Sequence, residues 1–307
     1  MPALHADASQ VTVSGLSSGG FMAVQMHVAH SRVVKGAGVL AGGPYYCAQA
    51  SVFAGYFNCR HPGFFTPLPP TAVLKAQTEA FAAAGRIDPL AGLAEGRAWL
   101  FSGTRDRTVA LAVVEALRAY YAALGVPSVL VRDKPAGHAM VTESFGNRCG
   151  TSEAPYVNDC DYDAAGELLG FLLGPLAPPA APAGRLIRFD QSRYAQGEAR
   201  AIGLAGEGFA YIASGCEEAP CRIHVAFHGC RQNADAVGGA FVREAGYNRW
   251  AESNRLIVLY PQTVARWLGL FNPRGCWDWW GYTGAAYATR DGAQIRAVKA
   301  MIDALAR

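Results

Sequence analysis

A serine that follows a short apolar run and precedes a helical pattern is well placed to do chemistry in this chain. Residues 11–20 read Val-Thr-Val-Ser-Gly-Leu-Ser-Ser-Gly-Gly, so that Ser17 is the centre of a Gly-x-Ser-x-Gly pentapeptide. At a strand-to-helix junction this pattern is typical of a nucleophile elbow, a tight turn that exposes the serine hydroxyl. The two glycines allow the strand and the helix to pack closely. The pattern predicts nucleophilic attack by Ser17, with a plain Ser/Gly turn as the alternative.

An acid and a base for this serine follow two later apolar runs. A serine nucleophile needs a histidine that accepts its proton and an acid that orients the histidine. Asp106 follows an expected strand at 98–102, and His138 follows another at 128–132. The order serine, acid, histidine is that of the α/β hydrolases. We therefore predict that Asp106 and His138 are the catalytic partners of Ser17.

Two other interpretations of the acid stay open. Asp133 lies closer to His138 in the sequence, but choosing it leaves the strand at 98–102 without a role. Asp106 could also be a residue of the N-cap region of the helix that we expect to begin at Val109. Its position just beyond a strand favours the catalytic role.

The amides that would stabilise an oxyanion lie in distant parts of the chain. The first N–H groups of the helix after Ser17 are unpaired and lie at its positive end. A second donor normally follows an early strand ahead of the serine, and no such strand precedes Ser17. Instead, an apolar strand at 223–227 leads into His228-Gly-Cys230, whose turn could present the Cys230 N–H. We interpret His228 as a structural loop residue, with a second base as the alternative.

Strand and helix patterns alternate along the chain, which predicts an α/β fold with a mainly parallel sheet flanked by helices. We expect strands at 10–15, 34–40, 98–102, 128–132, 186–190, 209–214, 223–227 and 256–260, and helices at 18–30, 71–84, 89–95, 109–124, 162–173, 235–253 and 290–306.

The order of these elements indicates a circularly permuted α/β-hydrolase fold. The segments that ordinarily come first follow a Pro-rich linker at 174–184, which would join the old termini. Permutation is tolerated where termini lie close together at the surface. We expect one domain over 1–307, with the nucleophile, acid and base in 1–173 and the oxyanion loop in 185–307; two domains are the alternative.

Composition narrows the possible partners. The chain has 307 residues, 51% of them hydrophobic, and a net charge of +3 without a basic stripe. These features argue against nucleic-acid and membrane partners. Residues 1–10 lack the pattern of a signal peptide, which fits a mature chain whose leader has been removed.

Eight cysteines favour an oxidising compartment, and hence a secreted or periplasmic protein. Eight cysteines allow 105 pairings, so the pairing is a hypothesis, and a zinc site is the alternative. No Cys-x-x-Cys pair supports zinc, and we predict no metal site. Three pairs close short loops, and Cys230 and Cys276 remain: Cys47/Cys59, Cys149/Cys160 and Cys216/Cys221.

Four segments together carry a family resemblance. They are Gly-Leu-Ser-Ser-Gly-Gly-Phe-Met at 15–22, Gly-Gly-Pro-Tyr-Tyr-Cys at 42–47, His-Gly-Cys-Arg-Gln-Asn at 228–233 and Gly-Cys-Trp-Asp-Trp-Trp at 275–280. They resemble extracellular poly(3-hydroxybutyrate) depolymerases of the fungal, circularly permuted, single-domain type. The same segments are similar to esterases that act on feruloyl or acetyl-xylan esters.

The resemblance implies roles for named residues. Ser17 would be the nucleophile, Asp106 the acid and His138 the base, and the Ser18 and Cys230 amides would form the oxyanion hole. A Cys230–Cys276 disulfide would pin the oxyanion loop to an aromatic loop. We expect substrate contacts from aromatic side chains, with burial in the core as the alternative for most of them: Tyr45, Trp277, Trp279 and Trp280.

These observations lead to one expected activity. The chain is predicted to be a serine esterase that depolymerises a short-chain polyhydroxyalkanoate through an acyl-enzyme, without a cofactor. Its partners would be a polyester or a small ester, and we expect a monomer. The alternatives are a feruloyl or acetyl-xylan esterase and a non-catalytic polymer-binding protein. The sequence shows no acidic or basic pocket residue that would suggest a peptidase.

Overall fold

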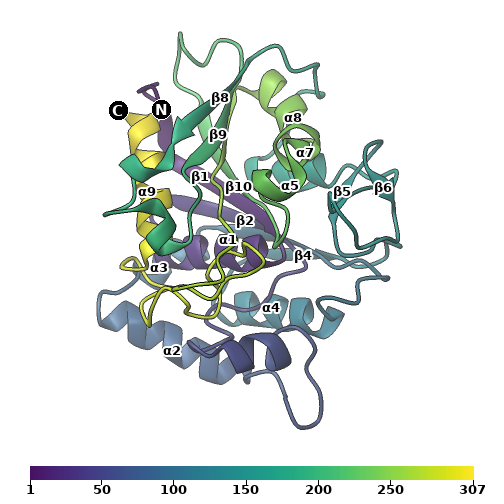
Figure 1. Ribbon diagram of the computed structural model, residues 1–307, viewed down its shortest axis with the longest axis vertical. Coiled ribbons are helices and arrows are strands. Elements are labelled where there is room, and N and C mark those ends of the chain that lie inside the picture. The colour runs from purple at the N-terminus through teal and green to yellow at the C-terminus, as the bar shows by residue number, and fades with distance from the viewer.

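The computed structural model describes residues 1–307 and contains an eight-stranded sheet with helices on both faces (Figure 1). The strand order is β4-β3-β2-β1-β10-β11-β9-β8, and β9 alone runs against the others. This is the mainly parallel sheet that the sequence predicts. Its strands are β1 (Asp7–Leu16), β2 (Val34–Leu40), β3 (Arg97–Phe101), β4 (Ser128–Val131), β8 (Arg185–Asp190), β9 (Glu207–Ile212), β10 (Arg222–Phe227) and β11 (Leu256–Tyr260).

Helices α1 and α5 cover opposite faces of this sheet. Val39 of β2 lies next to Gly20 of α1, whereas the preceding Gly38 lies next to Leu168 of α5. Successive strand residues face opposite sides, so the two helices cannot share a face. The helices are α1 (Ser18–Ala29), α2 (Thr71–Ala83), α3 (Leu90–Ala94), α4 (Leu111–Ala123), α5 (Ala164–Leu173), α6 (Ala234–Val237), α7 (Ala240–Glu244), α8 (Tyr247–Asn254) and α9 (Ala293–Ala306), with short π or 3₁₀ turns η1 (Ala54–Asn58), η2 (Gln191–Arg193) and η3 (Ala199–Ile202).

The chain ends meet at one place on the surface, as the permuted order requires. The His5 N–H donates to the Arg307 carbonyl at 3.0 Å, and the Leu4 and Ala6 N–H groups donate to the Leu305 carbonyl. Figure 1 shows the N- and C-terminal labels side by side, next to α9. The segment 174–184 contains no helix or strand and joins α5 to β8. The second half of the chain thus supplies the half of the sheet that begins beside β1.

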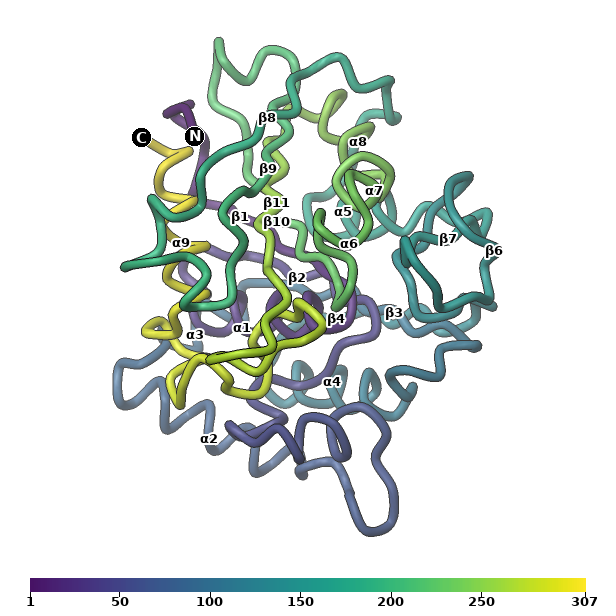
Figure 2. The backbone as a smooth tube through the Cα atoms, viewed as in Figure 1, coloured from purple at the N-terminus to yellow at the C-terminus, as the bar shows by residue number.

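Two features of the fold differ from the sequence prediction. The helix expected at 235–253 is three short helices, because the backbone turns at Gly238 (φ 60°) and Gly246 (φ 92°), conformations that only glycine adopts readily. The second difference is a small three-stranded sheet that was not predicted. Figure 2 shows it separate from the main sheet. Its strands have two or three residues, too few to show a period: β5 (Met140–Thr142), β6 (Asn147–Arg148) and β7 (Val157–Asp159).

All eight cysteines are paired, in the pattern predicted. The structure contains no free cysteine, which removes the zinc alternative. None of the helices is long and apolar enough to cross a membrane. The four disulfides are Cys47–Cys59, Cys149–Cys160, Cys216–Cys221 and Cys230–Cys276.

Four histidines outside the predicted catalytic set are buried in the fold. Burial lowers the pKa of His27 and His224 to about 3, and that of His30 and His228 to about 4, from an ordinary 6.5. His224 bridges two β1 hydroxyls, those of Thr12 and Ser14, at 2.8 and 2.7 Å. These rings are held neutral in the folded protein.

The buried histidines make the folded state sensitive to acid. Between pH 6.5 and about 4, each of these histidines is protonated in the unfolded chain and neutral in the folded one. Unfolding therefore takes up protons, and stability falls as the pH drops, by about 1 kcal/mol per pH unit for each histidine. Urea unfolding at several pH values in this range should show the free energy of unfolding falling with pH. His27→Gln should make that slope shallower by the contribution of one histidine. The exposed His61→Gln is the control and should leave the slope unchanged; a free energy of unfolding independent of pH in this window would contradict the prediction.

Candidate active site

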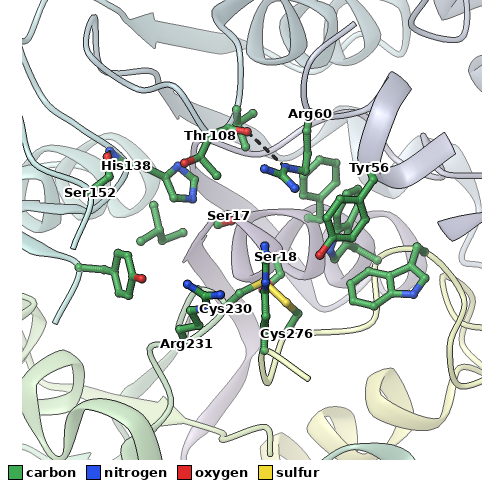
Figure 3. Close-up of a pocket in the computed structure, with 18 residues that line it drawn as sticks. Ser17, Ser18, Tyr56, Arg60, Thr108, His138, Ser152, Cys230, Arg231 and Cys276 are labelled. Carbon is green, nitrogen blue, oxygen red and sulfur yellow. Dashed lines mark hydrogen bonds between the residues drawn. A yellow bond between two sulfur atoms is a disulfide. The ribbon is translucent and has the colours of Figure 1, made fainter. Parts of the chain in front are cut away.

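Four loops that leave the same edge of the sheet build the site. Strands β1, β2, β3, β4 and β10 are parallel, so their carboxyl ends lie together. Ser17 follows β1, Asp106 follows β3, His138 follows β4 and Cys230 follows β10. The structure therefore brings together residues that are up to 213 positions apart in the sequence, as Figure 3 shows for Ser17, His138 and Cys230.

Ser17 has the strained backbone of a nucleophile elbow. Its φ of 58° and ψ of −122° are rare for a residue with a side chain. The chain needs glycine on both sides of Ser17, because other backbone atoms come too close for a side chain. A Cβ on Gly15 would lie 2.3 Å from the Gly19 carbonyl oxygen, and a Cβ on Gly19 would lie 2.3 Å from the Phe227 carbonyl oxygen. Hence the turn holds the Ser17 hydroxyl at the start of α1, where it lines a cleft.

Replacing Gly19 by alanine should destabilise the protein. The new methyl group would meet the main-chain carbonyls of Phe227, at the end of β10, and of His228 in the loop that follows. We expect a loss of about 1–3 kcal/mol in the free energy of unfolding, measured with urea. Gly170→Ala in α5 is the control, because nothing lies within 4 Å of its Cβ position and alanine favours a helix. Equal stability of the two variants would contradict this prediction.

Asp106 orients His138. The Asp106 Oδ2 lies 2.7 Å from His138 Nδ1, and its Oδ1 accepts hydrogen bonds from the Thr108 and Val109 N–H groups at 2.7 and 3.0 Å. Burial alone would raise the Asp106 pKa, but the charge of His138 and these hydrogen bonds hold it below its ordinary value. An ionised Asp106 keeps the proton of neutral His138 on Nδ1 and leaves Nε2 free to accept one.

The alternative acid is placed elsewhere. The Asp133 side chain is 75% exposed and lies 3.7 Å from the Lys134 ammonium. Ser17 and His138 line the same cleft, without a hydrogen bond between them in this structure. Catalytic hydrogen bonds often tighten only when substrate binds.

The loop after β10 is held by several contacts that the sequence did not reveal. The Cys230 N–H makes no hydrogen bond within the protein, and Cys230 and Ser18 both line the cleft. Gln232 accepts the Gly229 N–H at 2.8 Å and donates to the Tyr156 carbonyl at 2.7 Å. Together with the Cys230–Cys276 disulfide, these bonds position a free amide beside Ser17.

His228 is a structural residue of this loop. Its Nε2 accepts the Thr263 N–H at 3.1 Å, so its Nδ1 carries the proton and donates to the Gly229 carbonyl at 2.7 Å. Both ring nitrogens are thus occupied in the core. The geometry agrees with a loop role and leaves no nitrogen for a second base.

The cleft has a volume of about 200 Å³ and an aromatic wall. Trp279 and Trp280 line it, and Trp279 stacks on Phe21 with ring centroids 4.5 Å apart. The prediction that Trp277 and Tyr45 contact the substrate is wrong, because both side chains are buried in the core and do not line the cleft. The Tyr45 hydroxyl donates a hydrogen bond to the Ala288 carbonyl at 2.7 Å.

Three arginines also line the cleft, contrary to the expectation of a pocket without basic residues. They are Arg60, Arg231 and Arg274. They come from three loops: Arg60 directly follows Cys59, Arg231 directly follows Cys230, and Arg274 lies two positions before Cys276. Proximity to disulfide-bonded cysteines of the site is the one signal in the sequence that could have found them.

A serine on a strained elbow, a buried Asp–His pair and a free loop amide at the carboxyl edge of a parallel sheet define a serine hydrolase with the α/β-hydrolase fold. The chain is 44% identical to a poly(3-hydroxybutyrate) depolymerase of Delftia acidovorans, over 99% of this chain and 61% of that protein. It is 35% identical to a polyhydroxybutyrate depolymerase of Talaromyces funiculosus, over 97% of this chain and 90% of that protein. The chain belongs to the poly(3-hydroxybutyrate) depolymerase family.

Solved structures agree with this assignment. The crystal structure of the depolymerase from Penicillium funiculosum has a TM-score of 0.88 and 32% identity, covering 99% of this chain and 98% of that one. A depolymerase in complex with an R3HB trimer also has a TM-score of 0.88, with 33% identity and the same coverage. No family model matches the chain. The chain spans about three-fifths of the Delftia relative's length.

Proposed function

We propose that the protein hydrolyses the ester bonds of poly(3-hydroxybutyrate) or a similar short-chain polyhydroxyalkanoate. The observation that carries this proposal is the strained Ser17 in one cleft with His138, which Asp106 holds by a hydrogen bond. Membership in the depolymerase family supports the choice of polyester over other esters.

In the proposed reaction His138 accepts the Ser17 proton as the serine oxygen attacks the ester carbonyl. The Ser18 and Cys230 amides stabilise the oxyanion, each by about 3–4 kcal/mol. His138 then protonates the leaving alcohol, and Asp106 stabilises the imidazolium meanwhile. Water activated by His138 finally hydrolyses the acyl-enzyme and frees Ser17.

Exposed apolar side chains in two segments that also supply residues of the cleft support a polymeric substrate. One group lies in the segment that carries Arg60, and the other precedes Arg274. An aliphatic polyester gains contact with such a surface through the hydrophobic effect. The side chains are Phe53, Phe57, Phe64, Phe65, Trp267, Leu268 and Phe271, between 51% and 93% exposed.

We also propose that the enzyme is secreted or periplasmic and acts as a monomer. The four disulfides support the location, because disulfides persist in an oxidising compartment. Such a location suits a substrate too large to enter a cell.

Product analysis tests the proposed function. Films of amorphous and crystalline poly(3-hydroxybutyrate) should release 3-hydroxybutyrate or its oligomers. Release of acetate or ferulate from xylan, without release from the films, would instead identify a plant-wall esterase. Stoichiometric labelling of Ser17 by an organophosphonate distinguishes either enzyme from a polymer-binding protein without activity.

A further inference from the structure

The cleft around Ser17 is cationic. Arg60, Arg231 and Arg274 line it, and no Asp or Glu side chain does. Figure 3 shows Arg60 and Arg231 on opposite sides of Ser17 and Ser18 in this view. A narrow cleft with one sign of charge concentrates ligands of the opposite sign.

The three guanidinium groups keep free donors. The Arg60 Nε donates to the Thr108 carbonyl at 3.3 Å and its guanidinium lies 4.8 Å from the centre of the Tyr56 ring, while its two terminal amino groups have no partner in the protein. The Arg231 and Arg274 side chains make no hydrogen bond or ion pair within the protein. Arg60 is therefore held in place with its fork unoccupied, which is the geometry that binds a carboxylate at two points.

Two of these cations act on each other. Burial lowers the pKa of Arg60 and the charge of Arg274 lowers it further, although Tyr56 and the Asp106 carboxylate act in the opposite direction. Like charges that share a cleft repel each other unless an anion lies between them. An anionic ligand bound between Arg60 and Arg274 would thus reduce their mutual repulsion.

We propose that Arg60 and Arg274 bind the carboxylate end of a 3-hydroxyacyl oligomer, so that the enzyme hydrolyses the last ester bond of anionic oligomers faster than that of neutral ones. This inference rests on the proposed function. In such an oligomer only two carbon atoms separate the terminal carboxylate from the oxygen of the last ester. A carboxylate held at these two arginines therefore keeps that ester in the cleft that Ser17 lines.

Water is the only reactant that the proposed hydrolysis needs besides the oligomer. The Ser17 oxygen bonds to the acyl carbon, the acyl carbon–oxygen bond of the last ester breaks, and His138 gives its proton to the leaving oxygen. The 3-hydroxy acid departs with its carboxylate intact. Water then cleaves the acyl-enzyme and releases the shortened oligomer as a new carboxylate.

Paired substrates test the proposal. For the wild type we expect kcat/KM on the (R)-3-hydroxybutyrate trimer acid to exceed that on its methyl ester by about tenfold or more, the size of a charge-assisted hydrogen bond. Arg274→Gln and Arg60→Gln should each reduce this ratio, and the double variant should bring it close to one. Arg274 is exposed, so its variant tests the idea even if Arg60→Gln does not fold. Arg118→Gln, an exposed arginine on α4, removes the same charge outside the cleft and should leave the ratio and the basal activity unchanged.

The outcomes separate the two proposals. Equal wild-type rates on acid and ester, or a ratio retained in both arginine variants, would overturn the carboxylate subsite and leave the esterase function standing. Hydrolysis of neither trimer would overturn the proposed function itself. A ratio that falls as salt is raised supports the subsite, because salt screens the charges.

Discussion

Ser17→Ala is expected to abolish ester hydrolysis while the protein stays folded. Loss of a serine nucleophile removes the covalent route, and such losses amount to about 10⁴- to 10⁶-fold in kcat. The Ser17 hydroxyl makes no hydrogen bond in this structure, and alanine adds no atom to the turn, so the fold should tolerate the change. Hydrolysis of p-nitrophenyl butyrate, followed by absorbance, measures the loss.

A matched serine shows that the effect is local. Ser144 is exposed in a loop, and its hydroxyl makes no hydrogen bond within the protein, so Ser144→Ala should keep wild-type turnover. Circular dichroism and urea unfolding should show both variants folded. An alanine variant at Ser17 with wild-type turnover would refute its role as nucleophile.

Asp106→Asn should lower kcat by about 10⁴-fold with little change in structure. The Thr108 and Val109 N–H groups bind Oδ1 of Asp106 and would hold the amide oxygen of asparagine in the same place. The amide NH₂ would then face His138 Nδ1 and donate to it. This arrangement puts the histidine proton on Nε2, the atom that must accept the Ser17 proton.

Asp133→Asn is the control that separates the two candidate acids. Asp133 is largely exposed and does not contact His138, so its replacement should leave kcat unchanged. Steady-state kinetics on the same p-nitrophenyl ester compares the two variants. If the Asp133 variant lost activity and the Asp106 variant kept it, the acid would have to be reassigned.

Local patterns in the sequence predicted the elements that position the site. The apolar runs at 34–40 and 256–260 are strands with those bounds, and the strand–turn–helix around Ser17 has the backbone expected of an elbow. The permuted order also followed from sequence, because it needs only the succession of strands and motifs. These features depend on neighbours along the chain.

Features that depend on distant neighbours were not predictable in this way. Trp277 and Trp279 are two positions apart in one aromatic run, yet Trp277 packs in the core while Trp279 lines the cleft. Only the packing of the loop against Phe21 and Phe227 decides between them. The cationic lining of the cleft could not be predicted either, because Arg60 and Arg274 come into one cleft only after two loops fold over the same edge of the sheet.

The pairing of β1 with β10 has a consequence for the growing polypeptide. A ribosome makes β1, which leads into Ser17, well before β10, the strand that pairs with it. About two hundred residues separate the two strands in the sequence, and the amide of Cys230 lies beyond β10. At about 5–20 residues per second this interval lasts about 10–40 seconds. During this interval a nascent chain holds Ser17 without the Cys230 amide, so the proposed active site is complete only after β10 and the loop that follows it have been made.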